Sequence, residues 1–366
     1  MPALETLTLK GFKSIRELDR FQFGKINILI GANGAGKTNL ISFFKLLNEI
    51  VERRLQHYVR KQGGANTFLF EGAKTTKSIY AEVLFDLNGY RLRLEPTVDG
   101  NLFFAQEEMH FKGHYWPKLS DVGLGSGHSE SKLPEDADIS PGSIPSYVAP
   151  ALKGWRVYHF HDTSETAAVK QVHDIDDNRF FRPDAANLAA FLRLLRQTSP
   201  ERYRRIRETI QLVAPFFDDF LLEPMAGTPG QIQLEWKQRN SDSTFKAHHL
   251  SDGTLRFICL TVLLLQLGPP STLIIDEPEL GLHPFAIGVL AALIHEASQR
   301  TQLIISTQSA PLLDNFEPEH VIVVERKSGA SVFRRLEAEP LSQWLEDYSL
   351  GELVRKDIIE SGPQNE

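Results

Sequence analysis

One eight-residue stretch near the N-terminus constrains the fold of this chain more than any other feature. Residues 31–38 read G-A-N-G-A-G-K-T and fit the phosphate-loop pattern G-x-x-x-x-G-K-[ST]. The apolar segment Ile26–Ile30 leads into the loop, and apolar side chains recur at helical spacing from Asn39 onward. A strand, a glycine-rich loop and a helix N-terminus in this order can surround phosphate oxygens with backbone N–H groups. The stretch therefore predicts a site for a nucleoside triphosphate.

The side chains of this loop have distinct expected roles. Lys37 is expected to reach the β- and γ-phosphates of ATP, and Thr38 to offer its hydroxyl group to Mg²⁺. The other residues expected to bind the nucleotide are Asn33, Gly34, Gly36 and Asn39.

Composition limits the class of protein. A chain of 366 residues with 42% hydrophobic content can build one large core or two modest ones. Its apolar runs fall short of the roughly 18 residues that a membrane-spanning helix needs, and its first residues do not resemble a signal peptide. The single cysteine, Cys259, lies in an apolar helical stretch and fits a reducing compartment. We therefore expect a cytoplasmic protein without a membrane partner. The net charge of −7 excludes a uniformly basic surface and leaves room for a local basic patch.

The patterns along the chain suggest five parts. The segments Ser78–Phe85 and Tyr90–Leu94 alternate like a hairpin joined at Asn88-Gly89, and the first helix is expected to end near Gly63-Gly64. Residues 99–150 are rich in glycine and proline and are expected to form long loops. The expected parts are an N-terminal ATPase lobe with an antiparallel sheet (1–98), a loop-rich insertion (99–154), a strand followed by a helical subdomain (155–250), a parallel-sheet lobe (251–335) and a C-terminal docking segment (336–366).

An acidic pair follows another apolar strand. Residues 272–277 read T-L-I-I-D-E, so Asp276 ends the strand and Glu277 lies one position beyond it. Opposite a phosphate loop, Asp276 is expected to hold Mg²⁺ and Glu277 to polarise the attacking water. The final third alternates strands and helices, which favours a parallel sheet. The predicted class is an α/β P-loop fold with a mostly parallel core sheet, an antiparallel β lobe and an inserted helical subdomain.

The order of the motifs resembles the ABC ATPase superfamily. Residues 250–254 read L-S-D-G-T and precede an apolar helix, and the acidic pair follows 25 residues after Ser251. The segments G-F-K-S-I at 11–15 and E-L-G-L-H-P at 279–284 are similar to the SMC/RecF-like branch, and within it to short bacterial ATPases without coiled-coil arms, such as those of overcoming-lysogenization and defence systems. The resemblance covers 4–94 and 155–325.

The resemblance implies a mechanism shared between two copies. In the family, two heads sandwich two nucleotides, and Ser251 and Gly253 match the element that contacts the γ-phosphate of the opposite head. It also implies ATP hydrolysis, an ATP-linked homodimer or higher oligomer, and a separate effector protein such as a nuclease. DNA maintenance or defence against phage is the setting that the analogy favours, with DNA as a further partner.

The chain departs from the family in two places. His161 and Asp162 stand near the position of the family's glutamine loop. Gln308 stands where many relatives carry a histidine, and an amide cannot carry a proton, so we expect slow hydrolysis. Two other readings stay open, namely a nucleotide-gated scaffold with negligible turnover and the nucleotide-binding subunit of a transporter.

Several further groups of polar residues have weaker signals. The residues His159, His161, Asp162, His173 and Asp174 lack zinc-site spacing and favour a polar loop. The arginines between 193 and 207 suggest either a solvated face or contact with a DNA backbone.

Overall fold

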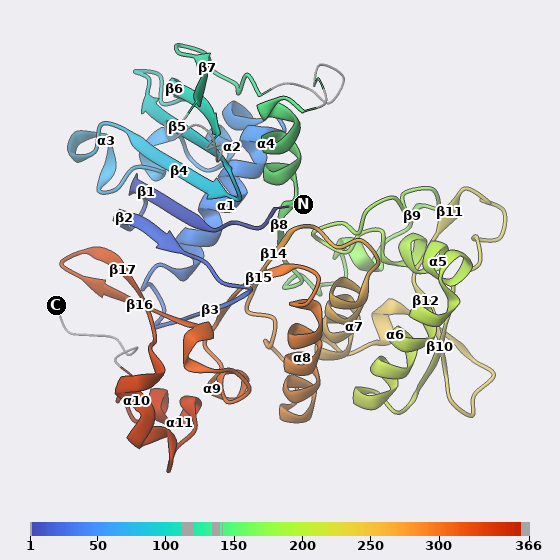
Figure 1. Ribbon diagram of the computed structural model, residues 1–366. Coiled ribbons are helices and arrows are strands. Elements are labelled where there is room, and N and C mark those ends of the chain that lie inside the picture. The colour runs from blue at the N-terminus through green and yellow to red at the C-terminus, as the bar shows by residue number, and fades with distance from the viewer. Residues whose placement is uncertain (1, 112–119, 134–139, 141, 360–366) are drawn as a thin grey trace.

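A computed structural model describes residues 2–111, 120–133, 140 and 142–359. Two six-stranded sheets organise the described chain, with helices between and beside them (Figure 1). Among these residues, no helix combines the length and apolar character needed to cross a membrane.

The core sheet carries the phosphate loop. Five of its strands are parallel and β17 is antiparallel to its neighbour β16. In spatial order the strands are β17 (Ala330–Arg335), β16 (Val321–Lys327), β3 (Ile26–Ile30), β15 (Gln302–Thr307), β14 (Thr272–Asp276) and β8 (Trp155–Tyr158).

Burial on both faces explains why the central strands read as continuous apolar runs. Successive side chains of a strand point to opposite faces. Ile274 and Ile304 accordingly join a cluster on the side of the antiparallel sheet, whereas Ile275 and Ile305 join a second cluster. Parallel strands covered on both sides need apolar residues at every position. The predicted mostly parallel core sheet is confirmed.

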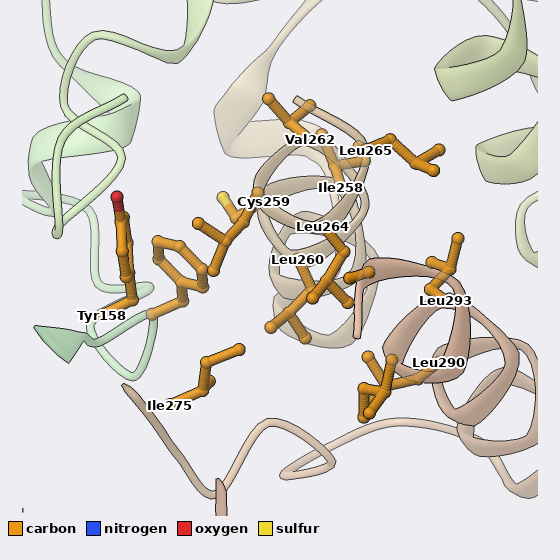
Figure 2. Packing of buried hydrophobic residues seen from close by; sticks show 14 of the residues in the cluster. Tyr158, Ile258, Cys259, Leu260, Val262, Leu264, Leu265, Ile275, Leu290 and Leu293 are labelled. Carbon is orange, nitrogen blue, oxygen red and sulfur yellow. The ribbon is translucent and has the colours of Figure 1, made fainter. Parts of the chain in front are cut away.

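The second cluster gathers around α7 (Asp252–Leu265). Figure 2 shows α7 side chains, with Tyr158 and Ile275 of the core sheet on one side and Leu290 and Leu293 of α8 (Pro284–Ala297) on another. Cys259 is buried in this cluster, and burial raises the pKa of its thiol to about 12. The thiol is therefore an inert part of the core.

The antiparallel sheet covers the other face of the core. Its strands, in spatial order, are β2 (Ile15–Gln22), β1 (Thr6–Phe12), β4 (Ile79–Phe85), β5 (Asn88–Pro96), β6 (Leu102–Phe111) and β7 (Ser120–Gly125). Helix α1 (Lys37–Val51) contributes Phe43, Phe44 and Leu47 to the cluster on this side. The predicted antiparallel lobe is confirmed.

Three local expectations were wrong. The hairpin turns at residues 86–87, because Phe85 pairs with Asn88 and the Asn-Gly pair lies inside β5. The first helix ends at Val51, and a separate α2 (Leu55–Lys61) follows. Much of the region expected to be loops is ordered, since β6 and β7 extend the antiparallel sheet and α4 (Ile144–Lys153) follows them. The expectation for residues 112–119, 134–139 and 141 lies outside the described residues.

The inserted subdomain follows β8 and lies to the right in Figure 1. Residues 231–236 contribute to two short strands that lie in different sheets. The elements of this part are β9 (His173–Asp174), α5 (Leu188–Thr198), α6 (Pro200–Val213), β10 (Phe217–Leu221), β11 (Gln231–Ile232), β12 (Glu235–Gln238) and β13 (Thr244–Lys246). The remaining helices are α3 (Gly72–Thr75), α9 (Ala310–Leu313), α10 (Ala338–Leu345) and α11 (Leu350–Arg355).

A buried carboxylate fastens the segment after β7 to the antiparallel sheet. Glu107 is fully buried and accepts hydrogen bonds from Tyr90 Oη (2.6 Å), Ser131 Oγ (2.5 Å) and the backbone N–H of Lys132 (2.9 Å). The Nε2 atom of His128 lies 2.8 Å from Glu107 Oε2, the oxygen that also accepts from Lys132. Tyr90, Ser131 and the backbone N–H of Lys132 all donate, so the two acceptor oxygens of Glu107 match these partners.

We expect Glu107→Gln to lower the free energy of unfolding by about 2 kcal/mol, because the amide would direct its own hydrogens at donor groups. Urea titration followed by circular dichroism measures the change. Glu17→Gln is the matched control, since Glu17 pairs with Lys10 on the exposed surface of the same lobe and such pairs contribute little. Equal effects of the two substitutions would contradict the prediction.

Candidate functional site

The phosphate loop connects β3 to α1 and depends on glycine. Gly34 and Gly36 have φ angles of 82° and 118°, a region that side-chain-bearing residues rarely adopt. A Cβ atom at Gly31 would lie 2.0 Å from the carbonyl oxygen of Val324. The loop therefore takes its shape from conformational freedom at two positions and from close packing against β16 at a third.

Two serine hydroxyl groups support the phosphate loop through hydrogen bonds. Ser14 Oγ and Ser331 Oγ lie 2.6 Å apart, and Ser331 Oγ also donates to the carbonyl oxygen of Ala35 at 2.5 Å. Asn39 Nδ2 donates to Ser14 Oγ at 2.6 Å, so this residue, which was expected to bind the nucleotide, contacts the serine pair. Sequence reasoning missed Ser331, which comes from β17 and carries no local motif. Ser14 could have been found, because it belongs to the G-F-K-S-I segment.

Lys37 is buried beneath the loop. Its Nζ donates to the carbonyl oxygens of Gly31 (2.5 Å) and Ala32 (3.1 Å). Burial lowers the pKa of Lys37, while Glu277 and Asp276 act in the opposite direction. A partly desolvated ammonium group can form strong charge-assisted hydrogen bonds with phosphate oxygens. By contrast Asn33, Gly34 and Thr38 are exposed to solvent.

The acidic pair lies at the same edge of the sheet as the loop. The strand β14 pairs with β15, and β15 pairs with β3, so the carboxyl ends of these parallel strands converge. Asp276 is buried and accepts a hydrogen bond from Ser306 Oγ. A carboxylate and the exposed hydroxyl group of Thr38 are the oxygen donors that Mg²⁺ prefers. The donor set thus fits the expected ion.

Glu277 is held in an unusual conformation. Its φ angle is 42°, and its backbone N–H donates to the carbonyl oxygen of Ser306 at 2.9 Å. Its carboxylate accepts a hydrogen bond from the Nε2 atom of Gln308. The structure therefore brings together two residues that the sequence placed in separate motifs. A left-handed backbone at a non-glycine residue in such a place is typical of functional sites.

A third acid, Glu279, supports the loop that carries Gln308. Its Oε1 atom accepts from Thr307 Oγ1 at 2.5 Å and from the backbone N–H of Gln308 at 3.3 Å. Burial raises the pKa of this carboxyl group, and its Oε2 atom has no hydrogen-bond partner among the described residues. Sequence reasoning assigned Glu279 no role, although it directly follows the D-E-P motif.

One guanidinium group connects α7 to the loops around the acidic pair. We call α7 the signature helix because it begins within the L-S-D-G-T segment at residues 250–254. Arg256 of α7 donates to the carbonyl oxygens of Phe160 (3.0 Å), His161 (2.9 Å) and Leu280 (2.8 Å). His161 Nε2 in turn lies 2.9 Å from the carbonyl oxygen of Asp276. His161 thus occupies a position beside the strand end, and Arg256 is a further residue that sequence reasoning missed.

The signature element, residues 250–254, lies apart from the phosphate loop of its own chain. Ser251 is exposed and caps α7, where its Oγ accepts from the backbone N–H of Thr254 at 3.2 Å. A Cβ atom at Gly253 would lie 2.4 Å from the carbonyl oxygen of Gly281, so this glycine is needed for contact with the loop after the acidic pair. Within the described residues, neither Ser251 nor Gly253 hydrogen bonds to residues 31–38.

The other candidate groups show structural roles. The described residues contain no group of three or more acidic, histidine or cysteine side chains that could hold a metal ion. Burial beside Lys45 lowers the pKa of His159 to about 4, so this imidazole is neutral. Four of the central arginines pair with carboxylates: Arg193 and Arg196 with Glu223, Arg205 with Glu296, and Arg207 with Asp219. These pairs favour the solvated-face interpretation of the arginine cluster.

A phosphate loop, an acidic strand end and a capped helix α7 on this two-sheet fold define an ATPase domain of the P-loop class. The family described as "AAA domain, putative AbiEii toxin, Type IV TA system" matches residues 26–315. The chain belongs to this family. A comparison with curated proteins found no match.

Solved structures of SMC heads share the fold. An SMC head bound to the C-winged helix domain of ScpA is 18% identical, with a TM-score of 0.61 over 93% of this chain and 100% of that one. The Pyrococcus furiosus SMC head with an extended coiled coil, bound to the C-terminal domain of ScpA, is 17% identical, with a TM-score of 0.58 over 95% and 99%. The Pyrococcus yayanosii SMC head with a coiled coil and joint is 15% identical, with a TM-score of 0.53 over 95% of this chain and 99% of that one. These likenesses establish the fold.

The raised pKa of Glu279 gives a pH-dependent prediction. A carboxyl group whose pKa is higher in the folded state than in the unfolded state opposes folding once it ionises. The stability that its protonated form provides is therefore lost as the pH rises through the folded-state pKa. We expect Glu279→Gln to be more stable than the natural chain above that pKa, because the amide oxygen can still accept both hydrogen bonds. The difference should vanish below about pH 4.3, where the unfolded carboxyl group is protonated as well.

Melting temperatures of the two proteins across pH 4 to 8 measure this difference. A difference that stays constant across the range would show that Glu279 acts through packing instead of charge.

Proposed function

We propose that this ATPase closes as a dimer around ATP and Mg²⁺ and acts as a motor or sensor subunit for a separate effector. The observation that carries the proposal is the separation of the two halves of the nucleotide site. The phosphate loop and the acidic pair share one edge of the core sheet, whereas Ser251 is exposed at the end of a different helix. A second copy could bring its Ser251 to the nucleotide held by the first.

The surface beside Ser251 supports a contact between copies. Leu280 and Phe285 flank the tight loop at Gly281, and they are 45% and 57% exposed. Exposed apolar side chains next to a functional element are typical of an interface. The N-terminus of α7, with its unpaired N–H groups, suits a phosphate brought by the partner.

The proposed chemistry is in-line attack of water on the γ-phosphate. Glu277 orients the water, and Lys37 together with Ser251 of the partner subunit stabilises the charge that develops on the phosphate. Thr38 and Asp276 would hold Mg²⁺, which neutralises phosphate charge when bound. Gln308 keeps Glu277 in place through its amide and cannot accept a proton, so turnover is slow.

The effector and the setting rest on analogy. The solved SMC heads include complexes with ScpA domains, and by analogy we propose a separate partner protein here, for example a nuclease. The proposed settings are DNA maintenance and defence against phage, with DNA as a further partner. The hydrogen bond between Gln308 and Glu277 also favours a second candidate function, a nucleotide-gated scaffold with negligible turnover. Phosphate release by the purified chain distinguishes the two.

We expect Glu277→Gln to form a dimer in the presence of ATP and Mg²⁺, because the closed state accumulates when water is not activated. Light scattering coupled to size exclusion gives the mass with and without nucleotide. Adding Ser251→Arg should abolish the dimer, since a long side chain at the exposed cap blocks the approach of the second copy. If the mass of Glu277→Gln is the same with and without ATP, the proposed ATP-dependent dimer is contradicted.

Arg256 provides a test of coupling within one subunit. We expect Arg256→Ala to lower kcat for ATP hydrolysis about tenfold or more, because three carbonyl oxygens around the acidic pair lose their donor. The dissociation constant for ATP should change little, since Arg256 does not contact residues 31–38. A variant that loses ATP affinity to the same extent as kcat would contradict this division of roles.

A further inference from the structure

A cleft lies outside the edge strand β8, apart from the phosphate loop. Its volume is about 580 Å³, within the range of pockets that hold small ligands. Buried aromatic side chains of Tyr158, Phe181 and Phe191 contribute to its lining, as do the prolines at 269 and 270. The interior of the cleft is therefore largely apolar and aromatic.

One aromatic ring at this cleft is exposed and flanked by two cations. Phe180 is 56% exposed, and the guanidinium carbons of Arg156 and Arg179 lie 4.9 and 5.4 Å from the centre of its ring. Within the described chain, neither arginine lies within ion-pairing distance of a carboxylate. Arg156 and Arg179 differ in this respect from the arginines of α5 and α6, four of which pair with carboxylates.

The acids near the cleft are already engaged. Glu49 accepts a hydrogen bond from Arg54 at 2.9 Å, and Glu52 lies 4.0 Å from the same guanidinium group. Asp184 accepts from the backbone N–H of Ala186 at 3.1 Å. Among the described residues that line the cleft, Glu52 is the one acid, and Arg156 and Arg179 each bring a positive charge.

We propose that this cleft binds an unpaired nucleotide, whose base stacks on Phe180 and whose phosphate contacts Arg156 and Arg179. An aromatic face beside guanidinium groups is the arrangement that recognises single-stranded nucleic acid, because stacking binds the base and the cations bind the backbone. A free mononucleotide offers the same chemistry. Duplex DNA does not, since its bases are stacked on one another and unavailable to the ring.

The cleft has a route to the acidic strand end. A second cavity, of about 440 Å³, shares Glu52, Lys153 and Arg156 with it and reaches Lys45 and His159. The ring of His159 lies 5.2 Å from that of His161, whose Nε2 atom is 2.9 Å from the carbonyl oxygen of Asp276. Only this link to hydrolysis rests on the proposed function, because binding in the cleft does not require it.

The test uses fluorescence anisotropy of a labelled 20-nucleotide oligothymidylate with the full chain and no ATP. We expect Arg179→Glu to weaken binding at least tenfold and Phe180→Ala to weaken it about tenfold, as loss of one stacking contact implies. Arg204→Glu is the matched control, since Arg204 is exposed on α6 and the charge change is the same. This control should stay within twofold of the natural chain.

Competition identifies the source of the ligand. Displacement of the oligonucleotide by dTMP at millimolar concentration supports a small nucleotide, whereas failure of dTMP to displace it supports a nucleic-acid strand. Absence of binding to the natural chain, equal weakening by the Arg204 control, or equally tight binding of a duplex would each overturn the proposal.

A further variant keeps the two proposals separate. Adding Arg179→Glu to Glu277→Gln should leave ATP-dependent dimer formation unchanged. Loss of oligonucleotide binding with the dimer intact assigns the effect to the cleft. Loss of both, together with a lower melting temperature, would show that Arg179→Glu damages the fold, and Phe180→Ala then decides the proposal.

Discussion

Burial of the core sheet on both faces determines where polar chemistry can occur in this chain. Inside the sheet, every position of β3, β14 and β15 is buried, and a charged side chain there would lack solvation. The loops that follow the carboxyl ends of these strands are the first segments that reach the solvent. The phosphate loop, Asp276 and Thr307 all occur at these ends, so packing and chemistry select the same edge.

The loops at this edge are held by groups from distant parts of the chain. Ser331 of β17 supports the phosphate loop from nearly 300 residues away, and Arg256 of α7 fastens residues on both sides of the acidic pair. Each contact supplies a hydrogen-bond donor to backbone carbonyl oxygens. A shift of α7 would therefore move the carbonyl groups of His161 and Leu280 together. This gives the signature element a direct mechanical connection to the acidic strand end.

The strands and the site motifs could be predicted because each is encoded locally. The alternation of strands and helices in the final third predicted a parallel sheet, and the octet at 31–38 placed the loop between a strand and a helix. The hairpin turn was misplaced because Asn-Gly is a strong local signal, yet the pairing of Phe85 with Asn88 sets the register instead. The glycine and proline content of 99–150 likewise suggested loops, although pairing along β5 holds β6 in the sheet.

What the sequence could not predict depends on contacts between distant segments. Ser331 and Arg256 have ordinary neighbours in the sequence, and only the folded chain brings them to the loops that they support. The same holds for Phe180, whose two arginines are recognisable as unpaired only once the positions of the surrounding carboxylates are known. Motif patterns identify residues that contact a ligand directly. They do not identify residues that act through another residue.

The contact between Gln308 and Glu277 links these observations to the pace of the proposed reaction. The carboxylate of Glu277 accepts a hydrogen bond from the side-chain amide of Gln308, which occupies one of its acceptor positions. Glu279 accepts hydrogen bonds from Thr307 Oγ1 and from the backbone N–H of Gln308, and these bonds hold the loop that carries the amide. A water molecule approaching Glu277 must therefore share it with Gln308 or displace the amide. This contact supports the slow turnover that we propose, which would suit a subunit whose output is the duration of its closed state.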